Sequence, residues 1–217
     1  MTNRHGFISA LLLLIALPLS AQGVWEQWDT EVIREAHTAS DFEYYSEEEK
    51  KVVLLMNLAR MDGPRFAETV LDEYVRTHNV DNNSYLRSLY RDLRNTEGLP
   101  LLHPEEDLTS IAQQHATESG RTGHTGHKNF EQRFEPFMGN PYQNVGENCS
   151  YGYARAIDIV LSLLIDDGVK SLGHRENILN PEFNSVGVAI REHKRYRYNC
   201  VIDYGKKDRS NLNNIPL

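Results

Sequence analysis

Cysteine is scarce in this sequence, which has only Cys149 and Cys200 among its 217 residues. A framework of several disulfides is therefore excluded. Basic residues are outnumbered too, with 23 Lys and Arg against 31 Asp and Glu and a formal net charge of -8. An acidic chain binds the nucleic-acid backbone poorly, so we expect no nucleic-acid partner. The charges are scattered along the chain, which indicates a solvated surface rather than a binding patch.

Short catalytic motifs are also missing. The sequence has no His-Glu-x-x-His or Cys-x-x-Cys string for a metal and no Gly-x-Ser-x-Gly motif of serine hydrolases. It has no internal repeat, no low-complexity tract and no apolar run long enough to span a bilayer. Function therefore has to be argued from residues that lie far apart in the chain.

The first 23 residues have the pattern of a secretory signal peptide. A short polar start precedes an apolar run over residues 7–17, and small residues follow around Ala21 and Gly23. The alternative is an amphipathic first helix that stays on the protein. We expect export to a periplasm or to the medium and exclude 1–23 from the fold.

The rest of the chain is long enough for one domain and hardly for two. We expect an irregular, aromatic-rich lead-in over 24–45, a domain over 46–205 and a polar tail over 206–217. Export would place the two cysteines in an oxidising compartment, which favours a Cys149–Cys200 disulfide over two buried thiols. Pairing needs Cα atoms within about 7 Å, which the sequence does not establish.

Apolar periodicity predicts the elements of that domain. Spacing typical of helices occurs at five places, about 46–62, 66–78, 84–93, 104–119 and 154–166. Alternation typical of strands occurs at 145–151, 185–190 and 198–204, the last two forming a hairpin. Helices followed by a strand, a helix and a hairpin favour an α+β fold, arranged as a three-layer α-β-α sandwich.

Two positions in the fourth helix have open interpretations. His115 lies on the apolar stripe, so a core histidine is favoured over a metal ligand. Gly120 is expected to end the helix. The following segment, 121–144, is rich in Gly, Pro and Asn and is predicted to be a long functional or covering loop.

Four side chains suit a divalent cation such as Zn²⁺: His124, Glu147, Asp166 and His174. Imidazole nitrogen and carboxylate oxygen are ligands of such ions, and this set can leave a position for water. From spacing alone the grouping is weakly supported, because nine histidines make chance groupings easy. His127 is an alternative ligand, although an exposed loop histidine is the favoured interpretation.

Three ordered motifs resemble a known family. They are Gly-His-Thr-Gly at 123–126, Gly-Glu-Asn with Tyr-Gly-Tyr at 146–153, and Gly-His-Arg-x-Asn-Ile-Leu-Asn-Pro at 173–181. Their order resembles the CAP superfamily of SCP-like extracellular proteins, which includes cysteine-rich secretory, antigen-5 and pathogenesis-related proteins, and within it the bacterial branch. The resemblance extends from the helix with Asn57 to the strand near Tyr204, with an insertion around 74–98. It implies an α-β-α sandwich with a central cleft of two His and two acids.

Carried over residue by residue, the two family histidines fall on His124 and His174, and the first acid falls on Glu147. The second acid is Glu in many members, but the helix before the last motif contains no Glu. Asp166 is its substitute, with Asp167 next. Glu147 has a second interpretation, in which it holds loops together through hydrogen bonds instead of binding metal.

Two neighbours of His174 have simpler expected roles. Arg175 and Glu176 are expected to form a surface pair worth less than about 1 kcal/mol. Asn177 is expected to cap a helix or to bond to a neighbouring loop.

The resemblance implies a secreted binding module whose cleft holds a divalent cation and a small apolar ligand or peptide. One alternative is a metal-assisted, protease-like hydrolase with Glu147 or Asp166 as general base. Another is a structural secreted domain with a vestigial cleft. We favour the binding module, because no nucleophile motif accompanies the cluster.

Overall fold

A four-stranded sheet forms the centre of the protein, which the computed structural model describes over residues 27–208. Its strand order is β1-β3-β4-β2, with β1 parallel to β3 and the other pairs antiparallel. The strands are β1 His103–Pro104, β2 Tyr142–Tyr151, β3 Ser185–His193 and β4 Arg197–Lys207. The predicted signal peptide at 1–23 and the end of the predicted tail lie outside the described residues.

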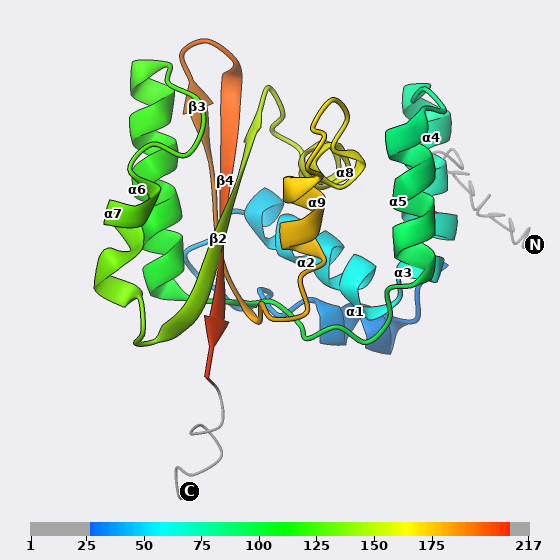
Figure 1. Cartoon of the computed structure of the whole chain (residues 1–217). Helices are drawn as coiled ribbons and strands as arrows, with labels where there is room; N and C mark the ends of the chain where they lie inside the picture. The colour runs from blue at the N-terminus through cyan, green and yellow to red at the C-terminus, as the bar shows by residue number, and fades with distance from the viewer. Residues whose placement is uncertain (1–26, 209–217) are drawn as a thin grey trace, which may run out of the picture.

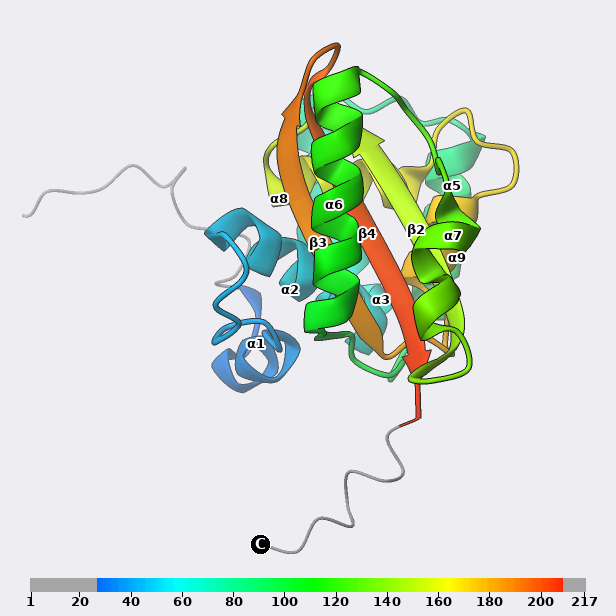
Figure 2. The ribbon, with the colours of Figure 1, turned by 90° about the vertical axis from the view of Figure 1, so that its left-hand side faces the viewer.

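Helices cover both faces of this sheet (Figure 1). The face covered by α6 and α7 is turned toward the viewer in Figure 2, and α2, α8 and α9 cover the other face, with α4 and α5 beyond them. The helical segments are α1 Thr30–Ala36, α2 Glu47–Met61, α3 Gly63–Phe66, η3 Ala67–Leu71, α4 Asp72–His78, α5 Ser84–Arg94, α6 Glu106–Thr122, α7 Phe130–Phe134, η4 Glu135–Phe137, α8 Ala156–Ile165 and α9 Gly173–Ile178. The α-β-α prediction is confirmed. No helix in the described part of the chain combines the length and apolarity needed to cross a membrane.

The sheet separates a large apolar core from two smaller ones. The large core lies between the sheet and helices α2 and α8, and it contains Cys200, Ile202 and Tyr204 of β4. On the α6 face, Cys149 and Val201 pack against alanines of α6. Because side chains alternate along a strand, neighbouring residues of β4 contribute to different cores.

The predicted disulfide is not formed, and this expectation is corrected. Cys149 and Cys200 are both buried free thiols. Cys149 is paired in register with Val201, and Cys200 with Ser150. The two thiols therefore lie on opposite faces of the sheet, one in each core.

The start of α2 is built as its sequence predicts. Ser46 Oγ accepts a bond from the Glu49 amide, and the Glu49 carboxylate accepts one from the Ser46 amide at 2.7 Å, which is a capping box. The other Glu49 oxygen accepts bonds from Ile190 N at 2.8 Å and Arg191 Nη1 at 2.9 Å. One carboxylate therefore starts the helix and attaches it to β3.

Two local expectations are wrong. The lead-in 24–45 is not irregular throughout, because α1 forms with Asp29 as its N-cap. Only Ala36 of this helix is buried, so the sequence has no apolar periodicity that would predict the helix. Gly120 lies inside α6, which ends at Thr122 with Gly123 as its C-cap. A Cβ on Gly120 would stand 2.0 Å from the Glu192 carbonyl oxygen, so this glycine permits close contact with β3.

Arg175 is buried rather than part of a surface pair, which corrects the expectation for it. Its side chain is 2% exposed, and its donors reach the end of α8 and groups of α5. The acceptors are Leu164 O (2.7 Å), Ile165 O (2.9 Å), Tyr85 O (3.0 Å), Ser88 Oγ (2.8 Å) and Asp92 Oδ2 (2.9 Å). Arg175 therefore fastens the inserted helix α5 to the family motif at 173–181.

Candidate functional site

Strand alternation places the candidate acid on the α6 face of the sheet. Glu147 and Cys149 of β2 point to this face, and Asp203 of β4 is paired in register with Glu147. Asn148 points to the other face, where its amide donates to the Tyr204 hydroxyl at 3.1 Å. The side chain of Glu147 is 1% exposed, so its partners decide its charge.

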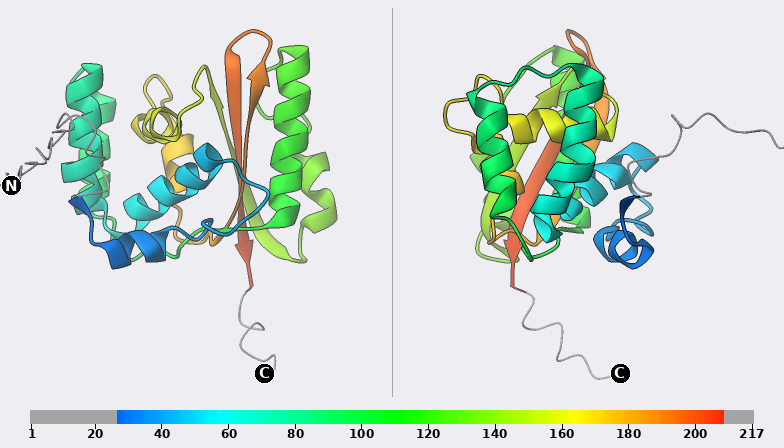
Figure 3. Two further views of the ribbon diagram at one scale, coloured as in Figure 1. Left: turned by 180° about the vertical axis from the view of Figure 1, so that it is seen from behind. Right: turned by 90° about the vertical axis from the view of Figure 1, so that its right-hand side faces the viewer.

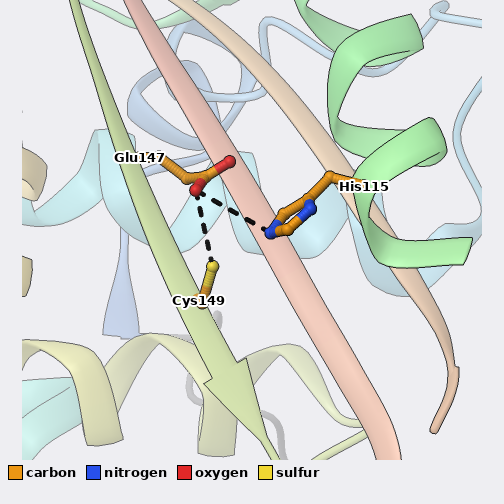
Figure 4. Close-up of side chains that lie close together, drawn as sticks. All are labelled: His115, Glu147 and Cys149. Atoms are coloured by element: carbon orange, nitrogen blue, oxygen red, sulfur yellow. Dashed lines mark hydrogen bonds and ion pairs between the residues drawn. The ribbon is translucent and has the colours of Figure 1, made fainter. Parts of the chain in front are cut away.

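Three potential metal ligands meet at this point. One ligand atom each of His115, Glu147 and Cys149 lies within 4.8 Å of the other two. His115 Nε2 is 3.9 Å and Cys149 Sγ is 3.8 Å from Glu147 Oε1. In Figure 4 the imidazole comes from α6 and the thiol from β2, and both approach the same carboxylate.

Two side chains from the 121–144 segment, His127 and Arg133, also contact the Glu147 carboxylate. His127 Nδ1 donates to Glu147 Oε1 at 2.8 Å, and Arg133 Nη2 donates to the same oxygen at 3.0 Å. Arg133 Nη1 also lies 2.7 Å from Oε2, as an ion pair without hydrogen-bond alignment. We call the whole group the Glu147 cluster; it consists of His115, His127, Arg133, Glu147, Cys149 and Asp203.

These contacts keep Glu147 ionised. Burial raises the pKa of its carboxyl group, whereas the hydrogen bonds from His127 and Arg133 and the charge of Arg133 lower it. The lowering effects outweigh burial, and the pKa of Glu147 is about 2. Glu147 is therefore a permanent carboxylate above strongly acidic pH.

Asp203 is in the opposite state. It is completely buried, and neither of its carboxyl oxygens has a donor within the described residues. Burial raises the pKa of Asp203 well above its usual range, and the charge of Glu147 and a hydrogen bond with Glu147 raise it further. Asp203 is thus protonated at neutral pH, and as an acid it can donate to Glu147.

His115 and Cys149 are both neutral. Burial lowers the pKa of His115, although the charge of Glu147 opposes this. Its Nε2 is 3.0 Å from the Gly126 carbonyl oxygen, which can only accept, so Nε2 carries the hydrogen. Burial raises the pKa of the Cys149 thiol well above its usual value, and the charge of Glu147 adds to this.

The other two predicted ligands lie on the far side of β2, where α9 packs. His174 Nδ1 is 2.7 Å from Asp166 Oδ1, and the His174 amide donates to Asp166 Oδ2 at 2.9 Å. Asp166 is the C-cap of α8 and has a left-handed φ of 57°. Because its carboxylate bonds to His174, it joins the end of α8 to the start of α9. Asp167 instead accepts a bond from Asn83 at the surface.

The predicted first histidine, His124, is exposed, and its carbonyl oxygen accepts a bond from His193 Nε2 at 2.9 Å. His127, the alternative, is the loop histidine that reaches Glu147. Within residues 27–208 the close ligand group includes Glu147 but none of the other three predicted ligands. Ligation by those four residues stays a prediction.

Asn177 bonds to a neighbouring segment, as expected. Its amide donates to Asn148 Oδ1 at 2.9 Å and to the Glu147 carbonyl at 3.3 Å. Asn148 in turn donates to the His174 carbonyl at 2.9 Å. These bonds attach α9 to β2 and bring the second and third motifs together.

Sequence reasoning missed Arg133 and Asp203. Arg133 lies in a Gly- and Pro-rich segment without periodicity, so no pattern assigns it a partner. Asp203 leaves a clearer signal, an acid inside the apolar strand around Val201 and Ile202. An acid in such a strand must be paired or protonated.

A cavity of mixed character lies elsewhere. It has a volume of about 350 Å³ between α2, η3, α4 and α8. Apolar side chains such as Leu55, Val70 and Ile157 share its walls with charged ones such as Glu48 and Arg155. The helices around it lie on the side of the sheet opposite to α6 (Figure 3, left). The cavity is therefore separate from the Glu147 cluster.

The model of the family described as "CAP: Cysteine-rich secretory protein family" matches residues 87–204. A search of curated proteins finds no match.

Three bacterial structures are similar to the chain. An extracellular protein with an SCP domain from Bacillus anthracis is 21% identical over 56% of this chain and 38% of its own, with a TM-score of 0.42. An outer surface protein from Borrelia burgdorferi is 20% identical over 59% and 97%, with a TM-score of 0.44. A cysteine-rich secretory protein from Staphylococcus aureus is 20% identical over 59% and 41%, with a TM-score of 0.38. The matched regions thus span less than half of the Bacillus and Staphylococcus chains.

Proposed function

This chain belongs to the CAP, or cysteine-rich secretory protein, family, and from that premise we propose that it is an extracellular binding module. Its Glu147 cluster takes a divalent cation, with Zn²⁺ the best match. The family description and the signal-peptide pattern of residues 1–23 support an extracellular location.

The observation that carries the cation proposal is the ligand group of His115, Glu147 and Cys149 beside an acid without a donor. Nitrogen, carboxylate oxygen and sulfur are the ligand types of zinc. Asp203, paired in register with Glu147, has two buried oxygens that lack donors. It lies outside the close ligand group, so it would become a fourth ligand only after losing its proton and moving toward the cation. Orphaned buried oxygens are rare, and a cation would satisfy them.

Binding requires changes in four protein groups, the first of which is Asp203, which must lose its proton before it can ligate the cation. His115 Nε2 must give up its hydrogen bond to Gly126, and Cys149 must lose its proton to become a ligand. Arg133 must move away from Glu147, because its guanidinium already neutralises the carboxylate. Cation binding should therefore release protons and be strongly pH-dependent.

The hydrolase alternative has less support. A general base works best with a pKa near the operating pH, whereas the pKa of Glu147 is about 2. Burial raises the pKa of the Cys149 thiol, which makes it a poor nucleophile. Asp166, the other candidate base, is engaged by the His174 ring and amide. A binding role requires neither a general base nor a nucleophile.

A small apolar ligand or peptide is the other part of the proposed binding function. The cavity between α2, η3, α4 and α8 is a candidate place for it, with Leu55 and Val70 as apolar walls and charged side chains such as Glu48 beside them. Its volume of about 350 Å³ falls in the lower part of the range of ligand pockets.

Removal of the Cys149 thiol is the direct test of the cation site. We expect calorimetric titration of Zn²⁺ into the chelator-treated protein to give micromolar affinity with proton release. Cys149→Ala should lower this affinity by about 100-fold, because it removes one ligand. Cys200→Ala is the matched control, since it removes a buried thiol from the opposite face. Absence of Zn²⁺ binding in the wild-type protein would contradict the proposal.

The same titration separates the Glu147 cluster from the site predicted by family resemblance. A double variant, His124→Ala with His174→Ala, should keep its affinity if the cation binds at His115, Glu147 and Cys149. Loss of binding in that variant, with Cys149→Ala unaffected, would move the site to the family histidines.

Arg133→Gln should raise Zn²⁺ affinity by at least about tenfold, because it removes a like charge that lies against the ligating carboxylate. Lys128→Gln is the matched control: it removes one positive charge from the same segment, where Lys128 pairs with Glu118 at the surface. Calorimetry checks both variants. Equal affinity in Arg133→Gln and wild type would show that Arg133 does not compete with the cation.

A further inference from the structure

The turn between β3 and β4 protrudes at one end of the molecule, beyond the end of α6 (Figures 1 and 2). We call residues 191–197 the hairpin tip. The Lys194 amide donates to the Gly120 carbonyl at 2.9 Å, which fastens the tip to α6. The Arg195 side chain lies over Gly123, where a Cβ would meet it at 3.1 Å. The tip is therefore held in place by the helix end.

The hairpin tip is strongly basic in an otherwise acidic protein. It contains four basic residues and one acid, Glu192, whereas the whole chain has a formal net charge of -8. Arg121, at the end of α6, lines a shallow hollow together with Lys194 and Arg197 of the tip. Positive charge is thus concentrated at this end.

These basic groups lack ion-pair partners within the described residues. Most other basic side chains are paired, and Arg191 at the base of the tip pairs with Glu49 at 2.9 Å. No acid within residues 27–208 lies within 4 Å of the charged groups of the remaining four, which are Arg121, Lys194, Arg195 and Arg197. Their charge is available to a partner.

An exposed tyrosine accompanies the charges. Tyr196, within the tip, is 44% exposed. The Tyr196 ring packs 5.6 Å from the Tyr151 ring, and the Arg195 guanidinium lies 5.8 Å from the Tyr196 ring centre. Tyrosine and arginine at a protruding end are the residues that proteins place at the membrane–water interface.

We propose that the hairpin tip docks on the surface of an anionic phospholipid bilayer. Lysine and arginine side chains on a protruding turn can reach a flat layer of phosphate groups together, while tyrosine lies at headgroup level. The negative charge of the remaining surface would orient the protein with this end toward the bilayer. A polyanionic chain fits less well, because the hollow that would receive it is lined by Glu192.

Vesicle sedimentation tests this proposal, with vesicles of phosphatidylcholine alone and of phosphatidylcholine mixed with an equal part of phosphatidylglycerol. We expect binding to the mixed vesicles only, and its loss at high salt. Lys194→Glu with Arg195→Glu should reduce the partition coefficient by at least about tenfold, because two attractive charges become repulsive. Both side chains are exposed, and circular dichroism checks that the variant is folded.

The matched control is Arg87→Glu with Arg94→Glu, which makes the same change in net charge on exposed positions of α5. This control should bind like the wild type. The milder pair Lys194→Gln with Arg195→Gln replaces the first variant if that one misfolds. Equal loss in the α5 control, retained binding in the tip variants, or binding to sulfated polysaccharide without binding to vesicles would each overturn the proposal.

Discussion

Replacing Arg175 by methionine is expected to lower the free energy of unfolding by about 3 to 5 kcal/mol. Methionine keeps much of the side-chain volume but removes the guanidinium. Two backbone carbonyls at the end of α8 and three oxygen acceptors on α5 then lose this donor. Of these acceptors, Tyr85 O still accepts a bond from Ser88 Oγ at 2.7 Å. A buried acceptor left without a partner costs about 1 to 3 kcal/mol. The cost at Asp92 is smaller, because its side chain is 33% exposed and water can hydrate it.

Urea unfolding at neutral pH measures this loss. Glu176→Ala is the matched control, because the neighbouring side chain is exposed and should change stability by less than about 0.5 kcal/mol. Arg175→Met should also loosen α5, which hydrogen exchange of its amides would detect. A loss of stability as small as that of Glu176→Ala would mean that Arg175 is a surface residue after all.

Asp203→Asn is expected to remove a pH dependence of stability. The raised pKa of Asp203 means that the folded state keeps a proton that the unfolded state releases above its ordinary pKa. Stability from this residue therefore falls by about 1.4 kcal/mol for each pH unit above that value, until the folded-state pKa is reached. Asparagine needs no proton, and its amide can donate to Glu147 as the protonated acid does.

Glu147 does not obscure this effect, because its lowered pKa changes the free energy of unfolding only at acidic pH. Its stabilising contribution is present above its unfolded pKa and is lost as pH falls toward about 2. Urea unfolding in chelator from about pH 5 to 8 should therefore show the wild type losing stability relative to Asp203→Asn. Asp167→Asn, at the surface, should keep the wild-type slope. Parallel curves for the wild type and Asp203→Asn would show that Asp203 is ionised in the folded state.

Local sequence rules predicted most of the elements. The capping box at Ser46 and Glu49 formed as predicted, and the strands expected at 185–190 and 198–204 form a hairpin that extends to 185–193 and 197–207. These features depend on neighbours a few residues apart, or on a simple alternation. The α1 helix was missed because it buries a single side chain.

Long-range contacts were harder to predict. Gly120 was expected to end a helix, because nothing in its neighbourhood reveals that Glu192 passes against it. Arg175 and Glu176 look like a surface pair until α5 is packed over the arginine. The predicted disulfide failed because two strand cysteines near each other in space can still lie on opposite faces of a sheet.

The sequence by itself determined that this is a CAP-type α-β-α domain and that Glu147 is a central acid, because ordered motifs and periodicity are properties of short segments. Only the tertiary structure decided which groups meet Glu147. Strand register placed Asp203 beside it, and the fold of the 121–144 segment brought Arg133 and His127 to it in place of His124. Charge, proton and ligand state depend on such contacts between distant segments, since burial and neighbouring charges set each pKa.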